Sequence, residues 1–156
     1  MGRFFSDKDT LLNELSTIRT NKKVVFTNGC FDLLHIGHIK YLKEARSKGD
    51  ILVVALNSDA SVKRLKGPTR PIQNENDRSE ILAALESVSA TVIFTEDTPE
   101  NIIKLIKPDV LVKGGDWKIS QIVGGEFVQS YGGQVLSLVF IDGKSTTSIV
   151  AKIEKS

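Results

Sequence analysis

Both histidines of the chain, His35 and His38, stand three residues apart with Gly37 between them. Residues at this spacing share one face of a helical turn, so both imidazoles can face one anionic group. Gly37 lets the backbone or a ligand approach closely. The pair follows an apolar run and a turn, where a helix N-terminus offers free N–H groups and the positive end of its dipole. The spacing indicates phosphate chemistry, with a helix cap, a chance surface pair or a metal site as the alternatives.

A cluster of cationic side chains further along the chain offers more charge for an anion. It comprises Lys63, Arg64, Lys66 and Arg70. A Gly-Pro and an Arg-Pro step within 67–71 interrupt regular structure, so the sequence predicts a mobile loop that closes over phosphates. A charge run is also typical of a solvated face, and that alternative stands beside the functional one.

Glycine-containing segments near the ends of two later apolar runs are further candidates for ligand contact. After the first of these runs, Gly114 and Gly115 permit close approach of a ligand, and Asp116 can accept from a hydroxyl or amine. An ordinary turn, followed by a core or edge tryptophan at Trp117, is the alternative. The segment 143–146, Gly-Lys-Ser-Thr, matches the end of a phosphate-binding P-loop, but the loop it leaves is too short to wrap a phosphate.

Alternating strand and helix patterns supply the elements that position these residues. The predicted strands are apolar runs bounded by turn residues, at Val24–Thr27, Ile51–Asn57, Thr91–Phe94, Val110–Lys113 and Val135–Ile141. The predicted helices are Asp7–Ile18, Ile39–Lys48, Asn76–Leu85, Glu100–Ile106 and Ser145–Ile153. This alternation predicts a doubly wound α/β fold with a parallel sheet of five strands, whose ligands bind outside the carboxyl ends of the strands.

Length and composition limit the classes of protein to which the chain can belong. Its 156 residues suit a single domain over 1–156, with residues 1–20 as an added N-terminal helix. A net charge of +2 is too balanced for a general nucleic-acid or membrane-surface binder. No apolar run is long enough for a membrane span and no signal peptide is visible. One cysteine, Cys30, excludes an internal disulfide and favours a reducing, cytoplasmic setting.

The residues 27–38, Thr-Asn-Gly-Cys-Phe-Asp-Leu-Leu-His-Ile-Gly-His, carry a family resemblance. Gly-x-Phe-Asp followed by His-x-Gly-His resembles the signature of the cytidylyltransferase-like nucleotidyltransferases. Within that superfamily, the chain is most similar to the heptose 1-phosphate adenylyltransferases. Supporting stretches run over nearly the whole chain from Lys23, at 57–61, 63–67, 70–71, 96–99, 113–117 and 142–147.

The resemblance implies a role for each residue that matches the family pattern. It implies that His35, His38 and Lys63 are catalytic. Residues implied to bind the nucleotide are Thr27, Asn28, Gly29, Phe31, Asp32, Gly37, Lys66, Arg78, Gly114, Asp116, Ser145 and Thr146. Residues implied to bind the sugar phosphate are Asn57, Asp59, Lys113 and Trp117.

Several of these residues also have ordinary structural interpretations. Asp32 can bind hydrated magnesium or cap its own loop, and the cap is the simpler interpretation. Arg78 can be an exposed helical arginine. The position of Cys30 is a variable small residue in the family, so we expect no catalytic thiol there. The arginine that precedes the Ser-Thr pair in cytidylyltransferases is missing, with Phe140 and Ile141 in that neighbourhood.

The reaction implied by the resemblance is transfer of AMP from ATP to a heptose 1-phosphate by direct in-line attack. ATP with Mg²⁺ would be the co-substrate, and no metal site built from protein side chains is expected. The expected partners are small molecules and further copies of the chain in a homodimer or larger oligomer, with no nucleic acid or membrane. The alternatives are a glycerol 3-phosphate cytidylyltransferase, another small nucleotidyltransferase, and a non-catalytic nucleotide-binding sensor. An aminoacyl-tRNA synthetase would need a much longer chain.

Overall fold

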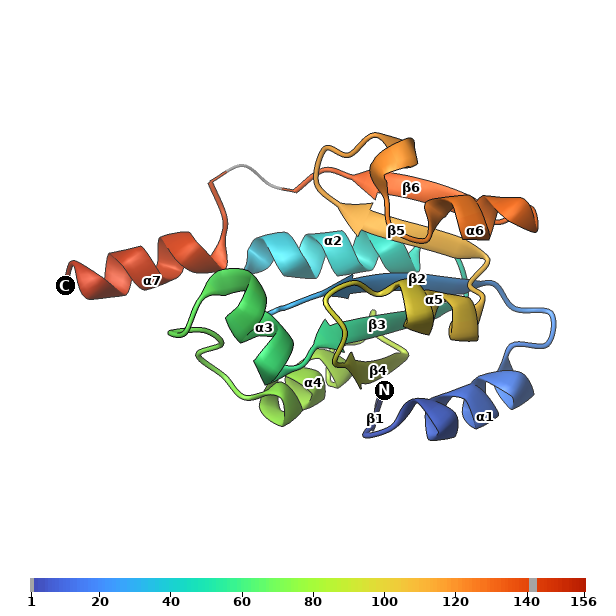
Figure 1. The fold of residues 1–156 in the computed structure, drawn as a ribbon, viewed down its shortest axis with the longest axis horizontal. Helices are drawn as coiled ribbons and strands as arrows, with labels where there is room; N and C mark the ends of the chain where they lie inside the picture. The colour runs from blue at the N-terminus through green and yellow to red at the C-terminus, as the bar shows by residue number, and fades with distance from the viewer. Residues whose placement is uncertain (1, 141–142) are drawn as a thin grey trace.

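The computed structural model describes residues 2–140 and 143–156. Its centre is one parallel sheet with the strand order β1-β4-β3-β2-β5-β6 (Figure 1). The strands are β1 (Arg3–Phe5), β2 (Val24–Gly29), β3 (Ile51–Asn57), β4 (Ala90–Phe94), β5 (Val110–Gly114) and β6 (Gln134–Leu138). The helices are α1 (Lys8–Ile18), α2 (Ile36–Arg46), α3 (Asp59–Lys66), α4 (Glu75–Ala83), α5 (Glu100–Ile106), η1 (Ile119–Gln121), α6 (Gly125–Ser130) and α7 (Thr146–Glu154).

The central strands are apolar over most of their length, up to the polar residues at their carboxyl ends, because helices cover both faces of the sheet. In β2, Val24 and Phe26 belong to the core cluster that contains helices α1, α5 and α6, whereas Val25 belongs to the cluster that contains α2 and α4. The same alternation runs through β3. A strand buried on both faces reads as a continuous apolar run, which is why β2 and β3 could be recognised from the sequence.

The strand order fixes where a ligand can bind. Successive crossovers from β2 lead through β3 to β4 on one side, and the chain then returns to place β5 on the other side of β2. The order therefore reverses between β2 and β5. In doubly wound sheets, the crevice outside the carboxyl ends of the strands at such a reversal is where ligands bind.

The sheet has six strands, one more than the sequence predicted. The additional strand, β1, pairs with β4 through Arg3 opposite Ala90 and Phe5 opposite Val92. Three residues are too few to show a strand periodicity, so this element could not be found from the pattern. The predicted last strand is also too long: β6 ends at Leu138, and Ile141 lies outside the described residues.

Residues 63–66 are helical, which corrects the prediction of a mobile loop over this cationic segment. They form the last turn of α3, whose N-cap Ser58 accepts a hydrogen bond from the backbone N–H of Ser61. The helix ends where Gly67 adopts a φ of 101°, so only the residues that follow form a loop. Helices α3, α6 and η1 were not predicted because they are short and their apolar residues are few.

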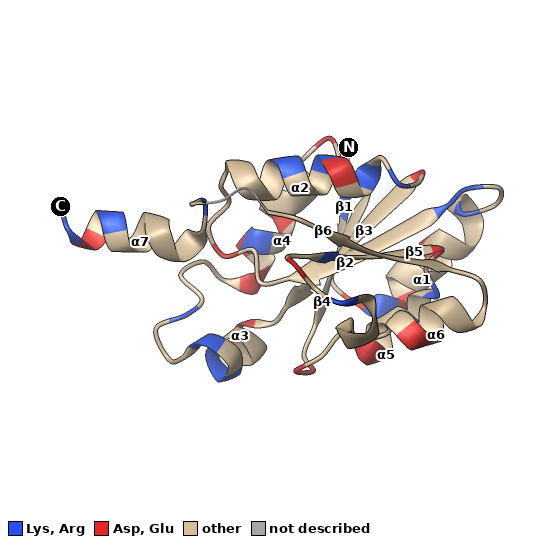
Figure 2. Cartoon of the chain, turned by 90° about the horizontal axis from the view of Figure 1, so that it is seen from above, with Lys and Arg blue, Asp and Glu red and all other residues tan. Residues whose placement is uncertain are grey.

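The two terminal helices have different relations to the core. Leu11 and Leu15 of α1 are buried, so this helix belongs to the main core cluster. In contrast, α7 has no buried residue and projects from the body of the molecule (Figures 1 and 2). No helix in the described parts of the chain is long and apolar enough to cross a membrane.

Candidate active site

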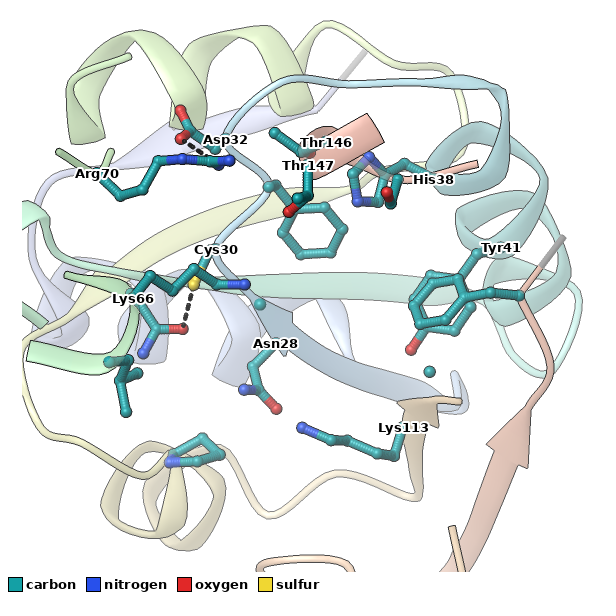
Figure 3. Close-up of a pocket in the computed structure, with 18 of the residues that line it drawn as sticks. Asn28, Cys30, Asp32, His38, Tyr41, Lys66, Arg70, Lys113, Thr146 and Thr147 are labelled. Atoms are coloured by element: carbon teal, nitrogen blue, oxygen red, sulfur yellow. Dashed lines mark hydrogen bonds and ion pairs between the residues drawn. The ribbon is translucent and has the colours of Figure 1, made fainter. Parts of the chain in front are cut away.

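A cavity of about 550 Å³ lies at the carboxyl ends of the strands, where the strand order reverses (Figure 3). Asn28 of β2 and Lys113 of β5 line it at its centre. The loop before α2, the end of α3, the segment after β4 and the start of α7 complete its wall. Residues distant in sequence, from His35 to Thr146, therefore meet in one space, as the predicted fold requires.

The two histidines form the N-terminal cap of α2. The backbone N–H of Gly37 donates to Nδ1 of His35 at 3.1 Å, and the backbone N–H of His35 donates to Nδ1 of His38 at 3.4 Å. Because each Nδ1 accepts, the proton of each neutral ring is on Nε2. The rings stack with their centroids 3.9 Å apart. This cap therefore presents two Nε2–H donors from adjacent rings, and both residues line the cavity.

Burial keeps both imidazoles neutral near pH 7. It lowers the pKa of His38 to about 4, with a smaller contribution from the neighbouring His35. Burial also lowers the pKa of His35, and the positive charge of Lys144 lowers it further. The free site is thus a pair of neutral hydrogen-bond donors, to which an anionic ligand would add the counter-charge that favours protonation.

Lysines supply the positive charge of the cavity. Lys66, Lys113 and Lys144 all line it, and within the described residues none of them has a carboxylate within ion-pair distance. Lys66 and Lys113 extend into it from opposite sides (Figure 3). Burial lowers the pKa of Lys113, an effect that negative charge on Cys30 would oppose. Three lysines from three elements surround a space that suits a polyanion such as a triphosphate.

Asp32 acts as a structural cap for the loop that follows α3. Its carboxylate accepts from the backbone N–H groups of Ile72 and Gln73 at 2.9–3.0 Å and pairs with Arg70 at 3.4 Å. These bonds use both oxygens of a side chain that is buried. Within residues 2–140 and 143–156, no group of three metal-binding side chains comes together. The geometry therefore favours the capping interpretation of Asp32 over the magnesium interpretation.

Most of the predicted site residues line this one cavity. From β2 and the loop that follows it come Asn28, Gly29, Phe31, Asp32, His35 and His38. From the other segments come Asn57, Lys66, Lys113, Gly114, Trp117, Ser145 and Thr146. Thr27, Gly37, Asp59, Lys63, Arg78 and Asp116 do not contribute to the wall. Of the six residues outside the wall, Lys63 lies within α3 and Arg78 within α4.

Arg78 and Asp59 pair with each other instead of facing the cavity. The Arg78 guanidinium is fully buried and donates to the Asp59 carboxylate at 2.8 Å. It also donates to the carbonyl oxygens of Cys30 at 2.7 Å and Gln73 at 3.0 Å. In this state Arg78 therefore braces the loop after β2, and reaching a bound phosphate would require it to leave these partners.

Two other predicted residues, Thr27 and Gly37, are buried behind the residues that line the cavity. Thr27 is buried, and its hydroxyl shares a hydrogen bond of 2.6 Å with the Tyr41 hydroxyl. Gly37 lies against the His35 ring, and a Cβ at this position would be 2.8 Å from that ring. Glycine is required here by the close packing of His35 over the first turn of α2.

Several lining residues were absent from the predicted site. They are Cys30, Tyr41, Leu65, Arg70, Asp97, Thr98, Pro99, Val123, Phe140, Lys144 and Thr147. Asp97–Pro99 follow β4, so the rule that ligands bind at carboxyl ends of strands could have found them. Cys30 is a wall residue whose thiol lies 3.9 Å from the Asn57 Oδ1. Burial raises the pKa of that thiol, which opposes a role as a nucleophilic thiolate.

The fold and the site define a class: a doubly wound α/β protein with a lysine- and histidine-lined cavity at its strand-order reversal. The cytidylyltransferase-like family model matches residues 26–149, which include most of β2 and all of β3 to β6. The chain belongs to the cytidylyltransferase-like family, as the sequence resemblance predicted. This family places the chain among the nucleotidyltransferases.

Curated relatives extend the match beyond the family model. "Bifunctional protein HldE" of Geobacter sulfurreducens is 58% identical over 135 residues, which are 86% of this chain and 28% of that protein. The protein of the same name from Citrifermentans bemidjiense is 58% identical over 164 residues, covering 100% of this chain and 34% of that protein. The chain thus spans about a third of the length of these relatives.

Solved structures agree with the fold. The lipopolysaccharide core biosynthesis protein from Thermoplasma volcanium is 30% identical with a TM-score of 0.62, and the match covers 79% of this chain and 99% of that one. Pantoate-beta-alanine ligase from Francisella tularensis, complexed with "Beta-gamma ATP" and beta-alanine, has a TM-score of 0.63 at 16% identity. That match covers 100% of this chain and 79% of the ligase, and it shows a shared fold only.

Proposed function

We propose that the chain transfers AMP from ATP to a heptose 1-phosphate, giving ADP-heptose and pyrophosphate. The observation that carries the proposal is the cavity in which two Nε2–H imidazoles and three lysines converge. The family supports nucleotidyl transfer. The sequence resemblance to heptose 1-phosphate adenylyltransferases, and the similarity to a lipopolysaccharide core biosynthesis protein, support the choice of acceptor.

In this mechanism the sugar phosphate oxygen attacks the α-phosphorus of ATP in line, and pyrophosphate leaves. Because the nucleophile is already an anion, no general base and no covalent enzyme intermediate are needed. His35 and His38 donate to oxygens of the α-phosphate and stabilise the charge that develops there. Lys66 faces the cavity and would bind the β- and γ-phosphates. Lys63 is on the same helical turn but does not line the cavity, so its predicted role requires α3 to move.

Magnesium would enter with the triphosphate. Asp32 already accepts two backbone hydrogen bonds and pairs with Arg70, so it has little free capacity as a ligand. Asp97, the other carboxylate that the described residues contribute to the wall, pairs with Arg64 at 2.8 Å. The residues of the site therefore fit an ion held by phosphate oxygens and water. When bound, it would neutralise part of the phosphate charge.

Two alternatives remain distinct from this proposal. A glycerol 3-phosphate cytidylyltransferase would carry an arginine before the Ser-Thr pair. Here Phe140 lines the cavity in that neighbourhood, and Lys113 stands at the end of β5 where an apolar residue is typical of those enzymes. A non-catalytic ATP sensor would keep the fold and bind nucleotide without releasing pyrophosphate. The intact His35 and His38 pair argues against it.

We further propose that the chain acts as a single domain in the cytoplasm, as a homodimer or larger oligomer. Two core clusters pack on opposite faces of one sheet, which supports the single domain. A half-buried reduced thiol at Cys30 is consistent with a reducing compartment. By the resemblance, the product would feed lipopolysaccharide core or another surface glycan.

The test is pyrophosphate release with Mg²⁺, with ATP and CTP each combined with β-heptose 1-phosphate and glycerol 3-phosphate. We expect release only with ATP and the heptose phosphate. Release with CTP and glycerol phosphate would assign the chain to the cytidylyltransferase alternative. If no mixture releases pyrophosphate although the chain still binds ATP, the result would favour the sensor or another acceptor.

A further inference from the structure

A small annex of about 80 Å³ adjoins the main cavity below its floor. Its walls combine Leu111 and Val112 of β5 with Ile122, Val123 and Gln121 from the segment that follows. Leu111 and Ile122 are buried, so the annex reaches below the strand ends toward the core. It is therefore a recess with a closed inner end formed by apolar side chains.

The annex joins the main cavity at the end that we assign to the acceptor. Both spaces share Asn28, Pro99, Lys113, Trp117 and Val123. Lys113 and Trp117 are the residues proposed to bind the sugar phosphate. His35, His38 and Thr146, which lie at the end of the cavity proposed to hold the triphosphate, line only the main cavity. The annex therefore lies on the Lys113 and Trp117 side of the cavity, and under the proposed function a group bound there belongs to the acceptor and not to the triphosphate.

The entrance to the annex is held in place by local structure. The Trp117 indole N–H donates to the Gly114 carbonyl oxygen at 3.0 Å, and its ring lies 5.5 Å from the Lys113 ammonium. Gly124, with a φ of 80°, turns the chain directly after Val123. A Cβ at Gly124 would be 2.8 Å from Ile103 of α5, so the turn at Gly124 packs closely against that helix, whereas the Val123 side chain itself is 41% exposed. The Trp117 hydrogen bond and the Gly124 turn give the entrance a defined shape, by which the annex can discriminate between substituents.

Size and chemistry limit what the annex can hold. Its volume exceeds that of a bound water and is far below that of the main cavity, so it accepts a substituent and not a ring. Apolar walls favour carbon atoms, and the amide of Gln121 can donate to or accept from one hydroxyl. A terminal hydroxymethyl group meets both conditions.

We propose that the annex binds the exocyclic terminal carbon and hydroxyl of the heptose, and that Val123 and Gln121 determine specificity for a seven-carbon sugar. This inference rests on the proposed function and adds the basis of its acceptor selectivity. A hexose 1-phosphate of the same ring configuration lacks the seventh carbon and leaves the annex unfilled. One such group in a fitted pocket changes kcat/KM by about 10–200-fold.

The test compares kcat/KM for the heptose 1-phosphate and the matching hexose 1-phosphate, with ATP saturating. In the unaltered chain we expect the heptose to be preferred by about 10-fold or more. Val123→Phe would fill the entrance and lower kcat/KM for the heptose about 10- to 100-fold, with the value for the hexose changed less than about threefold. Gln121→Ala would lower the heptose value about 10-fold by removing the partner of the hydroxyl.

Ile153→Phe is the matched control because Ile153 is 63% exposed on α7 and lines neither space. It should leave the preference unchanged. Equal values for the two sugars in the unaltered chain, or an unchanged preference in Val123→Phe, would overturn the inference while leaving adenylyl transfer intact. A loss of activity on both sugars alike in Val123→Phe would also overturn it. Failure of the unaltered chain to use any heptose 1-phosphate would instead contradict the proposed function.

Discussion

At the scale of single residues, the capping bonds of α2 make the two imidazoles hydrogen-bond donors. Each Nδ1 is occupied by a backbone N–H, so each ring can approach a phosphate only through Nε2–H. Gly37 permits this arrangement because it leaves room for the His35 ring above the first helical turn. The pair at positions 35 and 38 thus serves as a helix cap and as a phosphate donor at once. The cap was one of the alternatives that the spacing left open.

We predict that His38→Ala lowers turnover about 100- to 1,000-fold without unfolding the protein. Removal of a donor aimed at the developing charge costs about 2.7–4 kcal/mol in other enzymes. Steady-state pyrophosphate release measures the change, and circular dichroism verifies the fold. Lys40→Ala, an exposed residue on the same helix, is the control and should retain full activity. Full turnover in a folded His38→Ala variant would remove His38 from the mechanism.

The low pKa of His38 predicts a pH-dependent stability. Burial lowers it to about 4, against 6.5 in the unfolded chain. Between these values the unfolded state binds more protons, so the free energy of unfolding rises with pH. From pH 7 to pH 5 the protein should lose on the order of 1–2 kcal/mol through this group, after allowance for solvent screening.

Urea unfolding at both pH values, for the unaltered chain and for His38→Gln, measures this loss. Glutamine does not titrate, and the carboxylates contribute equally in both proteins, so the variant should lose less stability on acidification. An equal loss in the two proteins would show that His38 has an ordinary pKa in the folded state.

At the scale of elements, the strands with continuous apolar runs were predictable and the short elements were not. β2 begins with three apolar residues and β3 is apolar up to Asn57, and both strands are buried on both faces, so their apolar runs are visible in the sequence. β1 has three residues and depends on pairing with β4, a tertiary contact that no local pattern encodes. α3 is directly followed by the Gly-Pro and Arg-Pro steps of residues 67–71, and these steps led to the prediction of a loop over the whole cationic segment.

The residues of the site likewise divide into those that local motifs could reveal and those that they could not. Residues in the stretch 27–38 and at 113–117 were found because their motifs are local. Val123 lies between η1 and α6, away from every motif in the sequence, whereas Lys144 belongs to the 143–146 segment, in which only Ser145 and Thr146 were assigned to the site. Arg78 was predicted at the correct element, but its pairing with Asp59 required the positions of two separate helices.

We predict that Asp32→Ala loosens the segment after α3 and destabilises the fold by about 2 kcal/mol. The substitution leaves the N–H groups of Ile72 and Gln73 without their acceptor and releases Arg70 from its ion pair. Urea unfolding measures the change. Asp9→Ala, an exposed aspartate in the first turn of α1, should cost less than about 0.5 kcal/mol. Equal effects of the two substitutions would mean that the cap contributes nothing.

At the scale of the whole molecule, charge is concentrated by the fold and not by composition. The net charge is only +2, and acidic and basic side chains are interspersed over the helices (Figure 2). The fold nevertheless brings Lys66, Lys113 and Lys144 around one cavity. Among the described residues, the acidic side chains that line the cavity are Asp32 and Asp97, and each has an arginine partner. A balanced chain can therefore still bind a polyanion at one place.

Helix α1 packs into the same hydrophobic core as the strands and helices that carry the site, so we expect it to fold together with them. Leu11 is fully buried in the cluster that also contains Phe26 of β2 and Ile103 of α5. We predict that Leu11→Ala costs about 2–5 kcal/mol by leaving a cavity in this cluster. Because one core should unfold cooperatively, the urea midpoints measured by Trp117 fluorescence at the cavity and by far-ultraviolet circular dichroism should shift together. Leu105→Ala, at an exposed leucine of α5, should move neither midpoint appreciably. A shift in the circular dichroism transition alone would show that α1 unfolds separately, and the prediction of a single domain would then be wrong.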